Sequence, residues 1–302
     1  MPFRNLAVHN PAKISLRNNQ LIIETETMHS FPIEDINAVL IEDRQTVITT
    51  AALSALAKED VPLYICDEKH IPCGLFVSYY THSRQAKVSA MQMEMSQPLK
   101  KRLWQQIVIS KISNQAKCLQ LCGFRDESVY LLERTKAVKS GDPDNVEGSA
   151  AAFYFRVLFG GDFKRTSDDP RNAGLNYGYS IIRGCMARSV CMYGLLPFLG
   201  IHHRSEFNQF NLADDLMEPF RPIVDLYVFS HTAVIDELTP NIKHELISLL
   251  NMDILSETRH QSVAYAIELL VQSFRRVSDG VSKGKETLAL PELLPLVFHE
   301  YE

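Results

Sequence analysis

The chain contains 302 residues, of which 46% are hydrophobic and 22% are charged, an ordinary composition for one large or two modest globular domains. No run of eighteen apolar residues occurs, so we expect no membrane span, and the first ten residues lack the apolar core of a signal peptide. The six cysteines have no CxxC spacing, which excludes common zinc and redox motifs and is typical of free thiols in a reducing cytoplasm.

The net charge of −5 is unevenly distributed along the chain. Residues 1–83 carry a net charge of −4, residues 84–204 of +8 and residues 205–302 of −9. The overall balance argues against a uniformly basic nucleic-acid-binding protein. A basic middle block beside an acidic segment is nevertheless what a metal site acting on a polyanion needs.

The first 80 residues are predicted to form mainly strands. Residues 12–17 and 20–25 flank Asn18–Asn19, a pair that favours a hairpin turn. Further strands are predicted at 37–41, 62–66 and 73–77, and a short Ala-rich helix at 49–58. Because no catalytic constellation occurs here, we interpret this region as a small domain without chemistry of its own.

After residue 83 the apolar residues follow a helical period. Helices are predicted at 100–121, 129–137, 146–159, 174–196, 211–230, 240–252 and 257–278, with polar loops at 139–145 and 160–174. The fold class is therefore predicted to be α+β. A small β-rich N-terminal domain, residues 1–85, precedes a larger all-helical domain, residues 86–302.

Glu147 is predicted to lie in the first turn of the helix at 146–159. Asp144 and Glu147 are three residues apart, the spacing of a capping box, so helix capping alone accounts for both carboxylates. Gly148 and the small residues after it leave the Glu147 carboxylate unshielded, which would let another backbone approach it.

The stretch 200–225 combines two histidines with several carboxylates. On a helical wheel its polar face carries Asn211, Asp214, Asp215, Glu218 and Asp225. His202 and His203 precede this helix, and carboxylates with imidazole are ligands of divalent metals. The alternative is a solvated face of an amphipathic helix, which the pattern by itself favours.

Three motifs occur in order along the chain: EGSAAAFYF from Glu147, LNYGYSIIRGCMARSV from Leu175, and GIHHRSEFNQFNLADDLMEPFRPIVD from Gly200. Together they resemble the CRISPR adaptation integrase family, metal-dependent nuclease-integrases that insert spacers into CRISPR arrays. The paired histidines and the NLADD sequence are most similar to the type II branch. The resemblance covers the whole chain and implies a β-rich N-terminal domain and a helical catalytic domain.

The resemblance also implies a ligand set for Mg²⁺ or Mn²⁺. The family binds its metal through a glutamate, a histidine and a further carboxylate, which correspond to Glu147, His203 and Glu218, the expected catalytic residues. Some branches have aspartate in place of Glu218, which leaves Asp215 open as a ligand or as a water-mediated outer group. His202 is expected to pack beside the site.

The implied reaction is transesterification, in which a DNA 3′-hydroxyl attacks a phosphodiester of the repeat DNA. No protein nucleophile is needed, so Tyr177 and Tyr179 are expected to pack or to stack on DNA. The side chains expected to bind DNA phosphates are Lys164, Arg165, Arg171, Arg183 and Arg188.

The partners that the resemblance implies are double-stranded spacer and repeat DNA, a second copy of the chain in a homodimer, and a small ferredoxin-like adaptation protein. Other type II CRISPR proteins are further expected partners, in the cytoplasm and away from membranes. Two alternatives are also compatible with the sequence. The first is a metal-dependent phosphohydrolase of small phosphorylated substrates, and the second is a non-enzymatic helical scaffold.

Overall fold

The computed structural model describes residues 4–68, 72–79, 85–231, 238–278 and 287–300. Its N-terminal region contains β1 (Arg4–Val8), β2 (Lys13–Arg17), β3 (Gln20–Glu24), β4 (Met28–Pro32), η1 (Ile33–Asp35), β5 (Ile36–Ile41), β6 (Val47–Ile48), α1 (Thr50–Lys58), β7 (Leu63–Cys66) and β8 (Pro72–Phe76). The strands form two four-stranded sheets with the orders β1-β5-β7-β8 and β4-β3-β2-β6. The strand-rich character predicted for this region is therefore confirmed.

The predicted hairpin between β2 and β3 is confirmed. The two strands pair antiparallel from Lys13 opposite Glu24 to Arg17 opposite Gln20. Asn18 and Asn19 have φ angles of 50° and 58°, a left-handed conformation that asparagine tolerates better than most side chains. The local turn chemistry therefore sets the register of this pair.

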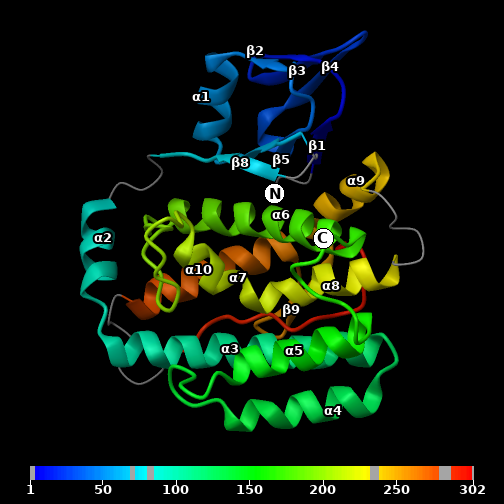
Figure 1. The fold of residues 1–302 in the computed structure, drawn as a ribbon. Helices are drawn as coiled ribbons and strands as arrows, with labels where there is room; N and C mark the ends of the chain where they lie inside the picture. The colour runs from blue at the N-terminus through cyan, green and yellow to red at the C-terminus, as the bar shows by residue number, and fades with distance from the viewer. Residues whose placement is uncertain (1–3, 69–71, 80–84, 232–237, 279–286, 301–302) are drawn as a thin grey trace.

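The rest of the chain is mostly helical. Its helices are α2 (Gln85–Glu94), α3 (Gln97–Leu121), α4 (Arg125–Arg134), α5 (Val146–Phe159), α6 (Pro170–Met192), α7 (Asn211–Met217), α8 (Arg221–Ser230), α9 (Pro240–Ser248) and α10 (Val263–Ser278). Short 3-10 helices, η2 (Thr135–Ala137), η3 (Glu218–Phe220) and η4 (Leu249–Asn251), follow α4, α7 and α9. In Figure 1, α6 lies directly beneath the N-terminal sheets, α7, α8 and α10 form the middle, and α3, α5 and α4 form the far side.

The sheet and the helices share a core across α6. Leu40 of β5 joins the core of the helical region, whereas its neighbour Val39 joins the N-terminal core, because successive strand residues point to opposite faces. Tyr64 of β7 lies against α6, where its hydroxyl donates to the Ile181 carbonyl at 3.0 Å. A Cβ at Gly184 would lie 2.1 Å from the Tyr64 ring, so only glycine permits this approach.

The expectation that the second region is all-helical is wrong. β9 (Asp253–Ser256) and β10 (Arg259–Ser262) form an antiparallel hairpin, and the helix predicted at 257–278 begins at Val263. Glu257 and Thr258 form the turn with φ angles of 48° and 67°, a conformation that neither residue type signals in a sequence.

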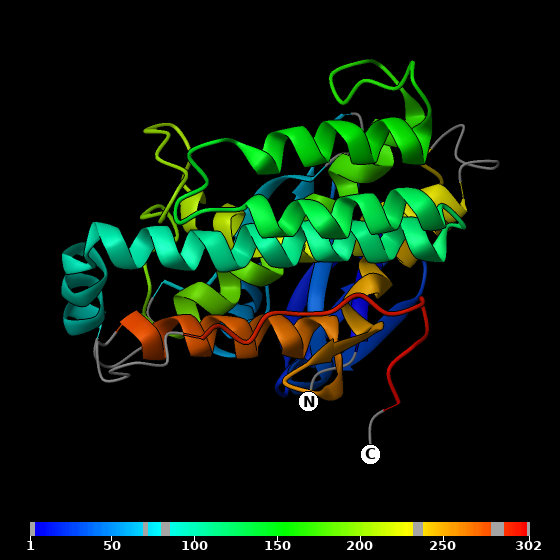
Figure 2. The ribbon, with the colours of Figure 1, turned by 90° about the horizontal axis from the view of Figure 1, so that it is seen from below.

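The segment 287–300 runs beside α10 (Figure 2) and pairs with β9. The Leu255 amide donates to the Glu292 carbonyl at 3.1 Å, and the Glu292 amide donates back at 2.8 Å. All six cysteines are free thiols, as predicted. Within the ranges that the structure describes, no helix is long and apolar enough to span a bilayer.

Candidate active site

The helix predicted at 211–230 is broken into α7, η3 and α8. Pro219 and Pro222 lie at the break and lack the amide hydrogens that a continuous helix would use. The side-chain amide of Asn114 on α3 donates to the Pro219 carbonyl at 2.8 Å. The break therefore gives Glu218 a position in a tight turn that is tied to α3.

The carboxylates of this segment are buried, so their interpretation as a solvated helix face is wrong. The polar side chains Asn211, Asp214, Asp215, Glu218 and Asp225 are each 6% exposed or less. A helical wheel shows which residues share a face, but it does not show whether another part of the chain covers that face. Here α3, α6 and the loop at 200–210 supply the cover and the hydrogen-bond donors.

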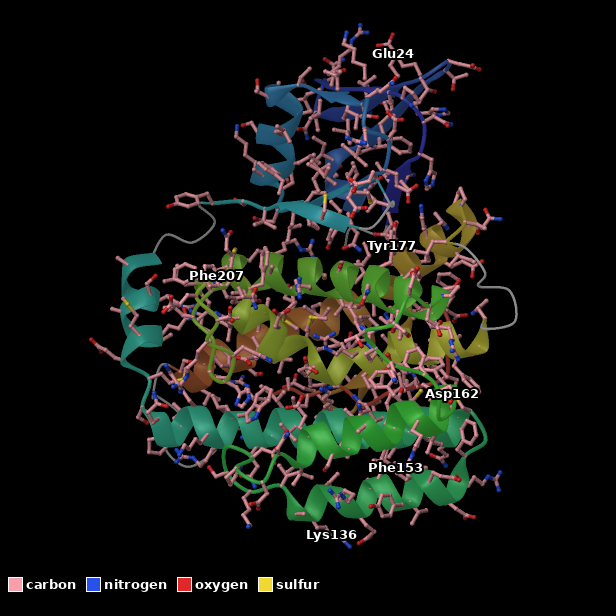
Figure 3. All side chains as sticks on the ribbon, viewed as in Figure 1. Glu24, Lys136, Phe153, Asp162, Tyr177 and Phe207 are labelled. Carbon is pink, nitrogen blue, oxygen red and sulfur yellow. The ribbon has the colours of Figure 1, made fainter. Side chains whose placement is uncertain are left out.

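Asp225 is held by two tyrosine side chains. Its carboxylate accepts hydrogen bonds from the hydroxyls of Tyr154, at 3.0 Å, and of Tyr179. Burial raises the pKa of Asp225 to about 6, although both tyrosine hydrogen bonds act in the opposite direction. Tyr179 is thus used in packing, and Tyr177 is buried on α6 at the side facing the sheets (Figure 3).

Asp215 holds the loop that carries His202 and His203. One carboxylate oxygen accepts from the amides of Ile201, at 2.7 Å, and His202, at 3.0 Å; the other accepts from the amide of His203 at 3.1 Å and from its Nδ1 at 2.7 Å. A Cβ at Gly200 would lie 2.8 Å from the Asp215 carboxylate, so a glycine is needed for the loop to close on it. Both Asp215 oxygens are thus fully used inside the protein.

The pairing with Asp215 defines the orientation of His203. Because Nδ1 donates to Asp215, the other ring nitrogen, Nε2, is left available to a ligand. The hydrogen bond to Asp215 raises the pKa of the half-buried His203 above its ordinary value of 6.5. Of the two roles that the sequence allows for Asp215, the geometry favours a group that orients His203 over a direct metal ligand.

His202 points to a different side from His203. Its ring is stacked on the buried Trp104 of α3, with 4.1 Å between the ring centroids and 4° between the planes. Trp104 also meets the His203 ring edge-on at 5.9 Å. The two imidazoles also meet edge-on, with 5.5 Å between their centroids and 88° between their planes. His202 is therefore packed on Trp104, whereas His203 is held by Asp215.

Glu147 does not form the predicted capping box with Asp144. Asn145 caps α5 by accepting from the Gly148 amide at 3.1 Å, while Asp142 accepts from the Glu147 amide at 3.0 Å. Asp144 instead pairs with Lys139 at the surface. The cap is made by other residues, so the Glu147 carboxylate is free to point toward α3.

Lys111 of α3 joins the two glutamates. Its Nζ lies 2.5 Å from Glu147 Oε1 and 2.5 Å from Glu218 Oε2, and the lysine side chain is only 11% exposed. Glu218 Oε1 accepts from Arg221 Nε at 2.8 Å. Burial alone would raise the pKa of Glu218, but the charges of Arg221 and Lys111 lower it to about 2. Glu218 is therefore an anion at any working pH.

Sequence reasoning did not identify Lys111, Arg221 or Trp104 as parts of the site. Lys111 and Trp104 lie on a long helix whose pattern shows only an apolar face, and nothing local indicates that they meet residues 100 positions later. For Arg221 a signal existed, because it follows Glu218 at the helical spacing i, i+3.

The donor set of this site fits a divalent metal in part. Among the described residues, no three His, Cys, Asp or Glu side chains are close enough to hold a metal as they stand. Glu218 Oε2 is nevertheless buried without a donor in hydrogen-bond geometry, and one cation already bridges it to Glu147. Two carboxylate oxygens and an imidazole nitrogen suit Mg²⁺ or Mn²⁺. Metal binding by Glu147, His203 and Glu218 stays a prediction.

Three of the five basic residues expected to contact DNA are already engaged by carboxylate or amide side chains within the protein. Arg165 donates to Asn172 and Asn176, and Arg171 donates to the carboxylate of Asp169. Arg183 pairs with Asp214 at 2.7 Å while keeping 41% of its side chain exposed.

The other two differ from each other. Lys164 is exposed on its loop, whereas Arg188 is half-buried on α6 and donates to the Asp60 carbonyl of the N-terminal region at 3.4 Å. The structure therefore places Arg188 against the sheet region, away from the loop that carries Lys164.

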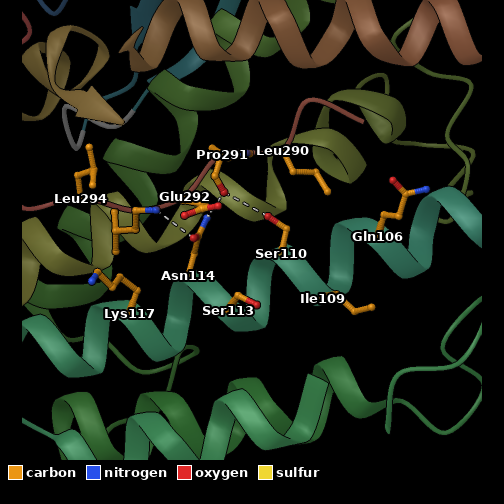
Figure 4. Close-up of a pocket in the computed structure, with 11 residues that line it drawn as sticks. Gln106, Ile109, Ser110, Ser113, Asn114, Lys117, Leu290, Pro291, Glu292 and Leu294 are labelled. Carbon is orange, nitrogen blue, oxygen red and sulfur yellow. Dashed lines mark hydrogen bonds between the residues drawn. The ribbon is translucent and has the colours of Figure 1, made fainter. Parts of the chain in front are cut away.

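A groove of about 480 Å³ lies between α3 and residues 290–294 of the C-terminal segment (Figure 4). Its floor is organised by Asn114, whose amide donates to the Pro291 carbonyl at 3.0 Å and whose oxygen accepts from the Leu293 amide at 3.0 Å. These bonds explain how the C-terminal segment is fastened to α3. The same asparagine holds the Pro219 carbonyl, so the groove and the Glu218 turn share one anchor.

Comparison with known proteins shows which proteins this chain resembles. The family model for CRISPR associated protein Cas1 matches residues 6–236. The CRISPR-associated endonuclease Cas1 of Neisseria meningitidis serogroup C (strain 8013) is 43% identical over 307 residues, which cover 100% of each chain.

Two solved structures share the fold at low sequence identity. A casposase bound to its integration product has a TM-score of 0.76 and 21% identity, over 95% of this chain and 92% of its own. A chain of a Cas6-RT-Cas1–Cas2 complex has a TM-score of 0.73 and 20% identity, over 96% of this chain and 36% of its own.

Proposed function

The chain belongs to the family of CRISPR-associated Cas1 endonucleases, and from its site we propose that it uses a divalent metal to insert spacer DNA into a CRISPR array. The observation that carries this proposal is the bridge through Lys111, which brings the carboxylates of Glu147 and Glu218 to one point. Carboxylates held together in a buried position are paired with cations or coordinate metals. We add the imidazole of His203 as the third ligand, because its Nε2 is left available and because oxygen and nitrogen ligands suit Mg²⁺ or Mn²⁺.

Glu147, His203 and Glu218 would hold the metal. When bound, Mg²⁺ or Mn²⁺ supplies polarisation of the phosphoryl oxygen and lowers the pKa of the attacking 3′-hydroxyl. The protein itself keeps Glu218 ionised through Arg221, and it keeps the His203 Nδ1 proton on the side of Asp215. The DNA end is the nucleophile, so no chemical step is assigned to the buried Tyr179, which contacts Asp225 and Arg221.

Duplex DNA is the proposed substrate, both as the incoming spacer and as the repeat. The segment 84–204 carries the positive charge of the chain, and the exposed Lys164 and partly exposed Arg183 lie in it. Both solved relatives named above are consistent with this, since one is described with an integration product and the other with Cas2. We propose a Cas2-type ferredoxin-like protein and a second copy of this chain as partners, because a spacer has two ends to join.

The alternative interpretations lose their support. A helical scaffold with a solvated acidic face is not compatible with carboxylates that are 6% exposed or less. A phosphohydrolase of small substrates would not need the basic block, and family membership favours DNA.

The proposed function is tested by strand transfer. The purified chain, with its Cas2-type partner, is incubated with a short duplex, a plasmid carrying a repeat array, and Mn²⁺. We expect joined products from the wild type and none from Glu147→Gln or Glu218→Gln. Glu127→Gln, on the first turn of α4, is the matched control and should retain full activity. Equal activity in all four proteins would refute the assignment.

A further inference from the structure

Lys111 occupies the position between the two glutamates that the proposed function assigns to a metal. Its Nζ is 2.5 Å from an oxygen of each carboxylate, so it is a built-in counter-ion for Glu147 and Glu218. Without this cation, two anions would lie together in a site where Glu218 is 4% exposed. Like charges at such a distance repel strongly when water is excluded.

One point between two carboxylates cannot hold two cations. A divalent metal binds carboxylate oxygens at roughly 2.0–2.2 Å, which is shorter than the present separations from the Lys111 ammonium. Binding of the metal to both glutamates therefore requires the ammonium to leave. The lysine ammonium is carried on a flexible four-carbon side chain, which allows it to move aside while the helix stays in place.

The second cation of the site has no such freedom. Arg221 donates to Glu218 Oε1 at 2.8 Å, and its guanidinium lies 4.5 Å from the centroid of the Tyr179 ring. Planar stacking and a directional hydrogen bond fix the orientation of this side chain. Of the two cations on Glu218, Lys111 is therefore the one suited to move.

On the basis of the proposed function, we infer that Lys111 is a displaceable counter-ion that couples metal binding to DNA binding. Before the metal binds, its ammonium holds the two glutamates together. When the metal binds, the ammonium is released beside it, where a DNA phosphate oxygen can take over as its partner. Binding of the metal alone breaks the two ion pairs of Lys111 with Glu147 and Glu218. When DNA is also bound, a new ion pair between Lys111 and a phosphate offsets that loss.

The inference is tested by Mn²⁺ binding, measured from the free-ion signal in electron paramagnetic resonance, with and without a short DNA duplex. In Lys111→Met, no ammonium competes, so without DNA we expect the variant to bind Mn²⁺ about tenfold more tightly than the wild type. Addition of the duplex should tighten Mn²⁺ binding by the wild type about tenfold and by the variant far less.

Thermal unfolding gives a readout that needs no activity. Without metal, Lys111→Met should have a lower Tm than the wild type, because two carboxylates lose their shared cation. Added Mn²⁺ should raise the Tm of the variant by more than it raises that of the wild type. Lys111→Gln keeps hydrogen-bond donors without the charge and should change both quantities in the same direction by less. If Lys111→Met does not fold, Lys111→Gln replaces it in both measurements.

Lys117→Met is the matched control, because it makes the same change on the same helix at a residue that lines the groove of Figure 4. It should leave the Mn²⁺ affinity and the effect of DNA unchanged. If the wild type and Lys111→Met bind Mn²⁺ equally, and DNA tightens both equally, the inference about Lys111 is wrong and the metal site stands. If neither protein binds Mn²⁺, the metal dependence in the proposed function is wrong as well.

Discussion

Replacement of Asp215 by asparagine should both destabilise the fold and weaken metal binding. In the native protein two carboxylate oxygens accept four hydrogen bonds, three from the amides of residues 201–203 and one from His203 Nδ1. Asparagine offers one oxygen and turns an amide group toward the remaining donors. A hydrogen bond to a charged group contributes about 1.5–3 kcal/mol, so the loss of two amounts to about 3–6 kcal/mol.

The same change removes the group that orients His203. Loss of a carboxylate behind a ligating histidine typically costs about 10–100-fold in metal affinity. The free energy of unfolding is measured by urea denaturation with EDTA present. The Mn²⁺ affinity is measured under conditions in which circular dichroism shows the variant to be folded.

Asp214→Asn provides the control at the adjacent position. Asp214 pairs with Arg183, which is 41% exposed, and accepts from Asn208 at 2.7 Å, so it has fewer and more solvent-accessible partners. We expect a loss of about 1 kcal/mol and little change in Mn²⁺ affinity. Equal stability of the wild type and Asp215→Asn, or an unchanged Mn²⁺ affinity in the folded variant, would refute the reasoning.

Four further predictions concern the titration of His203, the packing at Gly184 and the contacts of Arg165. The hydrogen bond to Asp215 raises the pKa of His203, and a ligating imidazole must be neutral. The Mn²⁺ affinity should therefore fall as the pH drops through a midpoint above 6.5. Titrations of the Mn²⁺ affinity against pH should show a lower midpoint in Asp215→Asn. The raised pKa also means that the stabilising effect of His203 is complete below pH 6.5 and is lost as the pH rises through the folded-state pKa, a trend that urea denaturation across pH would detect. Gly184→Ala should lose about 1–3 kcal/mol, because its Cβ would overlap the Tyr64 ring, and a wild-type urea midpoint would contradict this contact. Arg165→Ala should weaken duplex binding evenly across sequences and reduce the salt slope by about one if Arg165 contacts a phosphate, and an unchanged slope would show that it does not.

Local chemistry determined much of the fold. The hairpin at Asn18–Asn19 was predictable because asparagine pairs favour the left-handed turn that joins two strands. Helical periodicity located most of the long helices to within a few residues at each end. The hairpin at 253–262 was missed because Glu257 and Thr258 adopt a turn that their residue types do not favour.

Candidate residues of the site could also be proposed from the sequence, and their role in metal binding stays a prediction. The order of three motifs implied Glu147, His203 and Glu218, and alternation along an extended segment indicated that only one histidine would face the carboxylates. The structure agrees that His202 and His203 diverge, with one stacked on Trp104 and the other bound to Asp215.

What only the tertiary structure decided is which charges meet. A helical wheel gave Asp215, Glu218 and Asp225 the same surroundings, because it records direction and not what packs against each direction. In the folded chain Asp215 meets backbone amides, Glu218 meets Lys111 and Arg221, and Asp225 meets two tyrosines. Lys111, Tyr154 and Tyr179 lie on helices α3, α5 and α6, which precede this segment in the sequence. Pairing between buried charges depends on distances that are set only when such helices pack.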